Sequence, residues 1–391
     1  MPTKLNHAGN QQNYVPAGHG DASGEYGDND TGSNIHIQFK KFEKPNKDIK
    51  VDIKQNDDKE VKNDNSSENK KEDIKVVTDK AIDYVSNHST FNKKVKETLK
   101  DLMNNADEDC IRALNEAYSN NEYEFKIGSG VFAYGGILKV DKADFDEQGR
   151  IGRQGEVWFH ENGHLFDHSK NKYGKCLSTI AKDENGKTLH DLIKEELDEK
   201  IKNNELSGKI FSEEVNKLTE KYFNESEKPN VNVEETYNKY KEYKDKYDKQ
   251  YGEIHSEWLK GNISYEIYHQ RDNEIKQELE REYKETIENY KKLESLKLSS
   301  KKKAKNELSL KYSAISDAYG AVAKISYGLG IGHSYSYYKN RPEYLEIEFF
   351  ANCFSAKAGK DKASIETIKK YAPKSYALFE KILKGDYTIW A

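Results

Sequence analysis

Hydrophobic residues recur every three or four positions through most of the chain after residue 75, and this spacing predicts helices. The helical spacing runs from Thr78 to Met103, and residues 107–118 predict a second, short helix. The spacing then changes. Short runs of β-forming residues, separated by glycines, occupy residues 124–127, 131–134 and 137–140. We interpret these runs as the strands of a small β-meander.

Residues 170–305 contain few aliphatic residues, and many of their apolar positions are tyrosines. Aromatic and aliphatic residues keep three- and four-residue spacing over residues 237–258 and again over residues 275–293. We predict two long antiparallel helices with a turn at residues 261–262. An aromatic stripe at this spacing is more typical of a seam between helices than of a ligand platform.

The first 75 residues combine Gly, Asn, Asp and Ser with a stretch of Lys, Asp and Glu, and they lack the hydrophobic residues that a core needs. We predict that residues 1–75 are a disordered tail. Residues 76–171 and 306–391 carry the hydrophobic patterns of one domain. Residues 172–305 are then a helical insertion that a short linker could replace. The expected fold class is α+β and mostly helical.

Composition narrows the classes of protein to which the chain can belong. Hydrophobic residues make up 35% and charged residues 34%, so the core is a minority of the chain. Charges of both signs are interspersed with a net charge of -5, so the chain lacks the basic surface that nucleic-acid binding requires. Cys110, Cys176 and Cys353 are widely spaced, which supports neither a disulfide framework nor a cysteine zinc site, and we expect reduced thiols.

The sequence shows neither a run of about 18 apolar residues nor the apolar region of a signal peptide. We therefore expect a soluble protein without a membrane span or a Sec signal. Such a protein could lie in the cytoplasm, on a virion, or outside the cell after export by a route that leaves no such signal.

Residues 160–164 read His-Glu-Asn-Gly-His and lie in a segment that should be helical. On a helix His160 and His164 are one turn apart on one face, so both imidazoles can bind a single Zn²⁺ ion. Glu161 lies beside them and can polarise a water molecule on the metal, which is the arrangement of zinc peptidases. His168 continues the same face, but it lies about 12 Å from His160 along the helix axis and cannot bind the same ion.

A zinc site of this kind needs a third protein ligand and an open position for water. The longer motif that supplies a third histidine fails here, because Asp167 and Lys170 stand where its glycine and its last histidine would be. A downstream glutamate is the better candidate. Pro342 predicts the first turn of a helix that contains Glu346 and Glu348. These two side chains point roughly 160° to 200° apart on a helix, so only one can face the metal.

Two short motifs together resemble a known family. Residues 160–167, HENGHLFD, and residues 348–354, EFFANCF, are similar to segments of the catalytic domain of anthrax lethal factor and its relatives, the lethal-factor-like zinc metallopeptidases. The C-terminal YAPKSYALFEKIL also resembles the segment that closes that domain. The resemblance implies a zincin-like metallopeptidase fold, one zinc ion per chain, and an endopeptidase that acts on protein or peptide substrates.

The resemblance also implies roles for individual residues. His160, His164 and Glu348 match the three zinc ligands of the family, and Glu161 matches its general base. Asp167 matches the last position of the short motif and is a candidate for supporting a ligand histidine from behind.

The sequence departs from the family in two respects. The polar helices separate the glutamate from the histidine motif, and Arg341 occupies the position of the tyrosine that assists the oxyanion. Counting from the start of the helix selects Tyr338 for this role and Tyr337 next, while Tyr344 is an alternative that could equally be a packing residue. Glu346 would face away from the metal, where it either supports a motif histidine or meets solvent.

Two functions compete. In the first, a zinc endopeptidase, one of the three strands either receives the substrate as an added strand or is purely structural. The second is a non-catalytic structural or phage-assembly protein on the same fold, because LNHAGNQQNYVPAGHGDASGEYGDNDTGSN is similar to N-terminal tails of phage head-associated proteins. A flexible tail without a set function explains that segment equally well. The intact Glu161 favours the peptidase, since it would be a poor zinc ligand and has little structural reason to be there.

Overall fold

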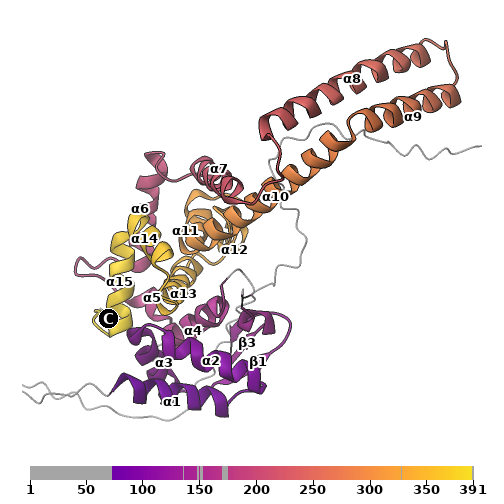
Figure 1. Cartoon of the computed structure of the whole chain (residues 1–391). Helices are drawn as coiled ribbons and strands as arrows, with labels where there is room; N and C mark the ends of the chain where they lie inside the picture. The colour runs from indigo at the N-terminus through magenta and orange to yellow at the C-terminus, as the bar shows by residue number, and fades with distance from the viewer. Residues whose placement is uncertain are drawn as a thin grey trace, which may run out of the picture.

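A computed structural model of the chain describes residues 73–134, 136–147, 149, 153–169, 175–326 and 328–389 (Figure 1). Within this part of the chain helices dominate and the one sheet has three short strands, which confirms an α+β, mostly helical fold. The predicted disordered tail lies outside the described residues, except at its end, where the first helix begins. None of the described helices combines the length and the apolar character that crossing a bilayer requires.

Three helices open the described part of the chain: α1 (Ile74–Asn87), α2 (Lys93–Asn105) and α3 (Glu108–Asn120). Each follows an Asp or Asn whose side-chain oxygen accepts a hydrogen bond from a backbone N–H of the first turn. The helical spacing from Thr78 to Met103 is therefore divided between two helices. The division arises because residues 88–90 leave the helix and exchange backbone hydrogen bonds of 2.9 and 3.1 Å with Phe125.

The sheet consists of β1 (Glu124–Ile127), β2 (Phe132–Tyr134) and β3 (Ile137–Val140), which lie where the sequence predicts strands. The predicted meander is wrong, because the order is β1-β3-β2, with β1 parallel and β2 antiparallel to β3. The loop after β1 explains the difference. Gly128 donates its backbone N–H to Val140 at the end of β3, and Gly130 has a φ of 82°. The loop thus crosses the end of β3 and leaves β2 on its far side.

Two helices that pack against each other form the centre of the main globular part, which we call the body: α4 (Glu156–Ser169) and α13 (Tyr344–Ala358). α4 lies on the sheet, where the ring centroid of Phe125 is 5.5 Å from that of Trp158. The ring of Phe145, which follows the sheet, lies 5.9 Å from Trp158. On its α13 side, Phe166 stacks on Phe350 with ring centroids 6.1 Å apart. The motif helix is therefore held between the sheet and α13.

Further elements complete the body: η1 (Lys142–Phe145), α5 (Leu177–Ile180), α6 (Leu189–Lys202), α7 (Gly208–Glu225), α11 (Ser313–Ala323), α12 (Tyr335–Tyr338), α14 (Lys362–Tyr371) and α15 (Pro373–Lys384). Pro373 opens α15, and Gly385 ends it with a φ of 75°.

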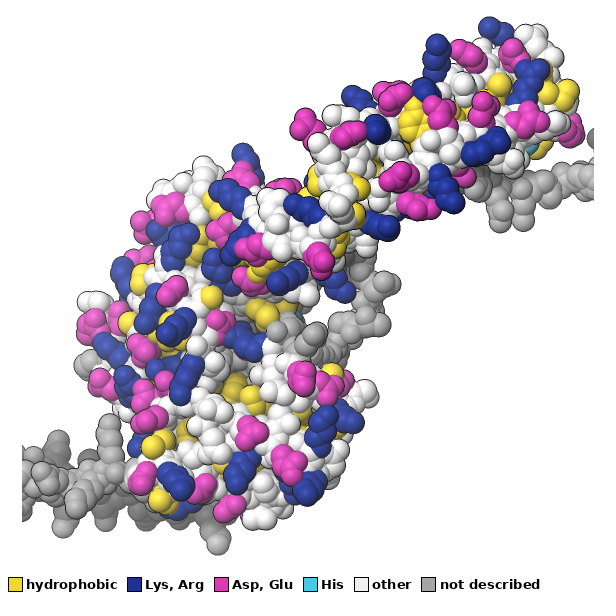
Figure 2. Space-filling model, in the orientation of Figure 1, with side chains coloured by type: hydrophobic (Ala, Val, Ile, Leu, Met, Phe, Trp, Pro, Cys, Tyr) yellow, Lys and Arg dark blue, Asp and Glu magenta, His cyan; other side chains and the backbone are white. Residues whose placement is uncertain are grey.

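α8 (Val233–Leu259), α9 (Tyr265–Glu282) and the first half of α10 (Lys284–Lys311) project from the body as a long arm (Figure 1). α8 and α9 run antiparallel around Gly261, which has a φ of 72°, as the sequence predicts. The second predicted helix, over residues 275–293, is instead divided at Tyr283 into α9 and α10. Tyr240 of α8 stacks on Tyr290 of α10 with ring centroids 3.5 Å apart, so the aromatic stripe is a seam between helices. Side chains of both signs cover the outside of the arm (Figure 2).

The predicted insertion comprises residues 172–305, and its first part, which contains α6, belongs to the body. Leu192 and Leu197 of α6 are buried in the same core cluster as the residues of α4 and α13. Glu196 accepts hydrogen bonds of 2.7 and 3.0 Å from the first backbone N–H groups of α15, so α6 also caps the C-terminal helix. That these residues are an insertion remains a prediction. Because α6 is part of the core, only the arm is a candidate for replacement by a short linker.

Candidate metal centre

A buried carboxylate fixes the start of α4. Asp144 of η1 accepts hydrogen bonds from the backbone N–H groups of Val157 and Trp158 at 3.1 and 2.7 Å. A carboxylate in this position satisfies N–H groups that the helix leaves unpaired and interacts favourably with the positive end of the helix dipole. Because the first turn is held in this way, the direction of the next side chains, including His160, is defined.

α4 and α13 approach each other closely at Gly163. A Cβ atom added to this glycine would lie 3.0 Å from the Cα of Ala351 and 3.0 Å from the Cβ of Phe354. A larger residue would therefore press the helices apart. Glu348 lies three residues before Ala351 on α13, so the glycine inside the histidine motif sets the spacing at which Glu348 faces the histidines.

His160, His164 and Glu348 converge between the two helices, and we call these three residues the metal group. The Nε2 atoms of the two histidines are 3.1 Å apart, and Oε2 of Glu348 lies 3.4 and 3.7 Å from them. The His164 and Glu348 side chains are 1% and 0% exposed, whereas His160 is 13% exposed. One ligand atom from each residue lies within 4.8 Å of the others, so the group could hold a metal ion.

The charges of the metal group suit a cation. Burial opposes protonation of His160, but the Glu348 and Glu161 carboxylates outweigh burial and raise the pKa of His160 to about 9. Burial by itself would favour the neutral acid of Glu348, yet the facing histidines hold its pKa well below the usual range. The carboxylates thus stabilise positive charge at the histidines, where a metal cation can replace a proton.

Glu161 is a buried carboxylate with 0% of its surface exposed. Among the described residues, neither of its oxygens has a hydrogen-bond partner, and the same holds for Oε2 of Glu348 and Nδ1 of His164. Burial raises the pKa of Glu161 and outweighs the lowering effect of the two histidines. Buried polar atoms without partners are rare and costly, so their concentration here is what a site for a cation and a polar ligand requires.

A tyrosine hydroxyl contacts the metal group, and it belongs to Tyr337. On α12, Tyr337 donates to Oε1 of Glu348 at 2.7 Å, whereas Tyr338 donates to Oδ1 of Asp317 at 2.9 Å. Tyr338, the first choice from the sequence for assisting the oxyanion, is thus engaged elsewhere, and the second choice faces the group. Burial, reinforced by Glu348, raises the pKa of Tyr337, so its hydroxyl keeps its proton and remains a donor.

Three other candidate residues lie outside the metal group. Glu346 pairs through Oε2 with Nδ1 of His190 on α6, at 2.8 Å. Asp167 accepts hydrogen bonds from the backbone N–H and the hydroxyl of Ser178 at 2.7 and 2.6 Å, so it anchors α5. Tyr344 accepts a hydrogen bond of 2.8 Å from a neighbouring arginine. None of these hydrogen bonds is to a histidine of the motif.

Sequence reasoning missed His333. Its ring stacks on Tyr337 with centroids 3.9 Å apart and an interplanar angle of 19°. Its backbone N–H and its Nδ1 lie 2.5 and 3.0 Å from Oδ1 of Asp317. The signal that could have found it is the run of residues 333–338, in which a histidine precedes several tyrosines just before the helix that carries Glu348.

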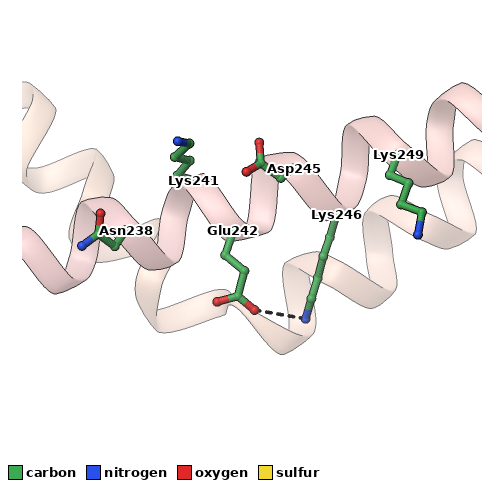
Figure 3. Close-up of a pocket in the computed structure, with 6 residues that line it drawn as sticks. All are labelled: Asn238, Lys241, Glu242, Asp245, Lys246 and Lys249. Carbon is green, nitrogen blue, oxygen red and sulfur yellow. Dashed lines mark ion pairs between the residues drawn. The ribbon is translucent and has the colours of Figure 1, made fainter.

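A shallow hollow on the arm is a weaker candidate for a ligand site than the metal group (Figure 3). Its lining residues are Asn238, Lys241, Glu242, Asp245, Lys246 and Lys249. All six come from one face of α8, and Lys246 forms ion pairs with Glu242 at 3.5 Å and with Glu282 at 2.9 Å. Such a face is typical of a solvated helix stabilised by ion pairs, and we assign it no ligand.

Comparison with known protein families, curated proteins and solved structures found no match. Function is therefore inferred from the geometry of the metal group and from the two sequence motifs.

Proposed function

We propose that this chain is a zinc-dependent endopeptidase of the lethal-factor-like type, with a zincin-like catalytic domain. His160, His164 and Glu348 are the zinc ligands, Glu161 is the general base, and Tyr337 assists the oxyanion. The observation that carries the proposal is Glu161, a fully buried carboxylate without a hydrogen-bond partner among the described residues, next to three convergent ligand atoms. An unpaired buried carboxylate destabilises a fold, and a role in catalysis explains why it is there.

The donor set fits zinc. Two imidazole nitrogens and one carboxylate oxygen are ligands of catalytic zinc sites, which keep a further position open for water. Ligand atoms about 2.0 to 2.1 Å from a tetrahedral ion lie about 3.3 Å from one another. The three separations in the metal group are 3.1, 3.4 and 3.7 Å, so small side-chain movements are enough to bind an ion there.

When bound, zinc would polarise the scissile carbonyl group and make a water molecule more acidic. Glu161 accepts a proton from the attacking water and donates it to the leaving amine nitrogen. Burial raises the pKa of Glu161 in the metal-free site, which makes its carboxylate a stronger base toward the attacking water. The Tyr337 hydroxyl, which remains protonated, would turn from Oε1 of Glu348 to the carbonyl oxygen as negative charge develops on that oxygen.

The position of β2 supports a peptide substrate. β2 is an outer strand that pairs only with β3 among the described residues, and it contacts α4. An extended peptide can add to such an edge through backbone hydrogen bonds. This mode of binding would bring the substrate backbone beside the motif helix whatever its side chains are.

Metal analysis of the purified chain, combined with a peptide-library cleavage assay, tests the proposal. We expect about one zinc ion per chain, and cleavage that a chelator abolishes and added zinc restores. Glu161→Gln should keep the zinc and lower cleavage by at least about 100-fold, since it removes the general base and not a ligand. Glu346→Gln is the matched control, because it changes a buried glutamate of α13 outside the metal group and should preserve both zinc and cleavage.

Cleavage by Glu161→Gln at the rate of the unaltered chain would refute the assigned mechanism. Stoichiometric zinc without cleavage of any peptide would instead favour the non-catalytic structural or phage-assembly protein.

A further inference from the structure

Beside the metal group, one buried carboxylate joins three separate elements. Oδ1 of Asp317 on α11 accepts hydrogen bonds from the backbone N–H of His333 at 2.5 Å and from the hydroxyl of Tyr338 at 2.9 Å, and it pairs with Nδ1 of His333 at 3.0 Å. Its Oδ2 accepts a hydrogen bond of 2.7 Å from Nδ2 of Asn352 on α13. Asp317 is 4% exposed, so these groups replace the water that a carboxylate would otherwise bind.

Glycines bring the loop at residues 328–332 against α11. Gly332 has a φ of 150°, and a Cβ atom there would lie 3.0 Å from Oδ1 of Asp317. On the helix, a Cβ atom at Gly320 would lie 2.7 Å from the carbonyl oxygen of His333. Side chains at these two positions would separate the loop from the helix, and His333 would lose its contact with Asp317.

Tyr337 connects this network to a ligand of the metal group by stacking and a hydrogen bond. The ring of His333 lies on the ring of Tyr337 at 3.9 Å, and the Tyr337 hydroxyl donates to Oε1 of Glu348 at 2.7 Å. Because Nδ1 of His333 is held by Asp317, the imidazole cannot turn without losing that bond. The stacked tyrosine is confined with it, which keeps its hydroxyl directed at Glu348.

We propose that Asp317 and His333 form a positioning pair that holds the Tyr337 hydroxyl at the metal group. This inference rests on the proposed function. It gives a role in that function to two residues that lie outside both sequence motifs. His333 acts through Tyr337, so losing His333 has the same consequence as losing the Tyr337 hydroxyl. The effects of the two losses should therefore not add.

A double-mutant cycle tests the pair. His333→Leu, Tyr337→Phe and the double variant are compared with the unaltered chain in zinc affinity, measured by competition with a chromophoric chelator, and in peptide cleavage. Groups that hold a metal ligand from behind change affinity or activity about 10- to 100-fold. We expect each single variant to weaken zinc binding by about 10-fold, and the double variant to be no weaker than the worse single variant. Independent effects that multiply, or unchanged affinity in both single variants, would overturn the inference.

His190→Leu is the matched control. His190 also pairs with a carboxylate of α13, at 2.8 Å, but that carboxylate belongs to Glu346 and lies outside the metal group. The zinc affinity of His190→Leu should stay within about twofold of the unaltered chain, even if thermal unfolding shows that it loses as much stability as His333→Leu. If His333→Leu loses the far-ultraviolet circular dichroism spectrum of the fold, His333→Phe replaces it in the cycle with the same expectation, because it removes the contact with Asp317.

The two measurements separate this inference from the proposed function. Non-additive zinc affinities without cleavage of any peptide would support the positioning pair and refute the peptidase. Cleavage by the unaltered chain, with multiplying effects of the His333 and Tyr337 substitutions, would support the peptidase and refute the pair.

Discussion

Replacing Gly163 with alanine tests whether the close approach of α4 and α13 sets the geometry of the metal group. The added Cβ would lie 3.0 Å from the Cα of Ala351 and from the Cβ of Phe354. Neither atom can rotate away, because one belongs to the backbone and the other is bonded to it. The helices must separate by a few tenths of an ångström, and Glu348 moves with α13 while the histidines stay on α4. Gly163→Ala should therefore weaken zinc binding as well as the fold.

Two opposing contributions decide the change in stability. Alanine is favoured over glycine in a helix interior by about 0.8 to 1.0 kcal/mol, whereas overpacking a filled core costs about 1 to 3 kcal/mol. Gly163→Ala should therefore lower the free energy of unfolding by about 0 to 2 kcal/mol. Gly252 of α8 supplies the first contribution alone, because an added Cβ there meets nothing within 4 Å. Gly252→Ala should accordingly stabilise the chain by up to about 1 kcal/mol.

Urea denaturation followed by far-ultraviolet circular dichroism gives the free energy of unfolding of both variants without metal, and chelator competition gives their zinc affinity. The difference in stability between the two variants, about 1 to 3 kcal/mol, is the cost of packing. We expect weaker zinc binding only in Gly163→Ala. If Gly163→Ala proved as stable as Gly252→Ala, the helices would have room for a methyl group, and the argument that this glycine sets their spacing would be wrong.

Other contacts predict equally definite outcomes. Glu348→Ala should lose stoichiometric zinc in a metal analysis, and Glu346→Ala should keep it, because only the former faces the histidines. Replacing residues 231–296 with a linker of about four residues should preserve zinc content and the fold of the body, since the seam of the arm is separate from the core. Replacing residues 172–305 with the same linker should unfold the body, because it removes α6, and the loss of helical signal in circular dichroism would show this. Glu196→Gln should lower the free energy of unfolding by about 1 to 3 kcal/mol in urea, because it weakens the cap of α15.

Features that depend on local spacing could be predicted from the sequence. The tyrosine seam of the arm and the three strands lie where hydrophobic periodicity places them, because each element shows its buried face within its own residues. The order of the strands could not be predicted in this way. It depends on how the loop at Gly128 crosses β3, and the division between α1 and α2 depends on Phe125, which is distant in sequence. Pairing between distant segments leaves no periodic signal in either of them.

The metal group shows the same limit at the level of side chains. His160 and His164 could be predicted to meet, because four residues on a helix bring them to one face. Helix geometry showed only that Glu346 and Glu348 cannot both face the metal, and the resemblance to the lethal-factor-like motif selected Glu348. The structure brings Glu348 to the histidines and Glu346 to α6. The choice depends on how α13 is rotated against α4, and that rotation is set by packing between segments that are distant in sequence.

Counting along the chain ranks Tyr338 before Tyr337, whereas the structure brings the Tyr337 hydroxyl to Glu348. Tyr337 and Tyr338 are neighbours on α12, so their side chains point about 100° apart, and the rotation of this short helix decides which one faces Glu348. That rotation is set from α11, because Asp317 accepts the hydroxyl of Tyr338 and binds His333 next to it. With Tyr338 held there, Tyr337 is the residue directed at Glu348. The number of residues between a tyrosine and Glu348 carries no information about Asp317, so it cannot show which of the two tyrosines faces Glu348.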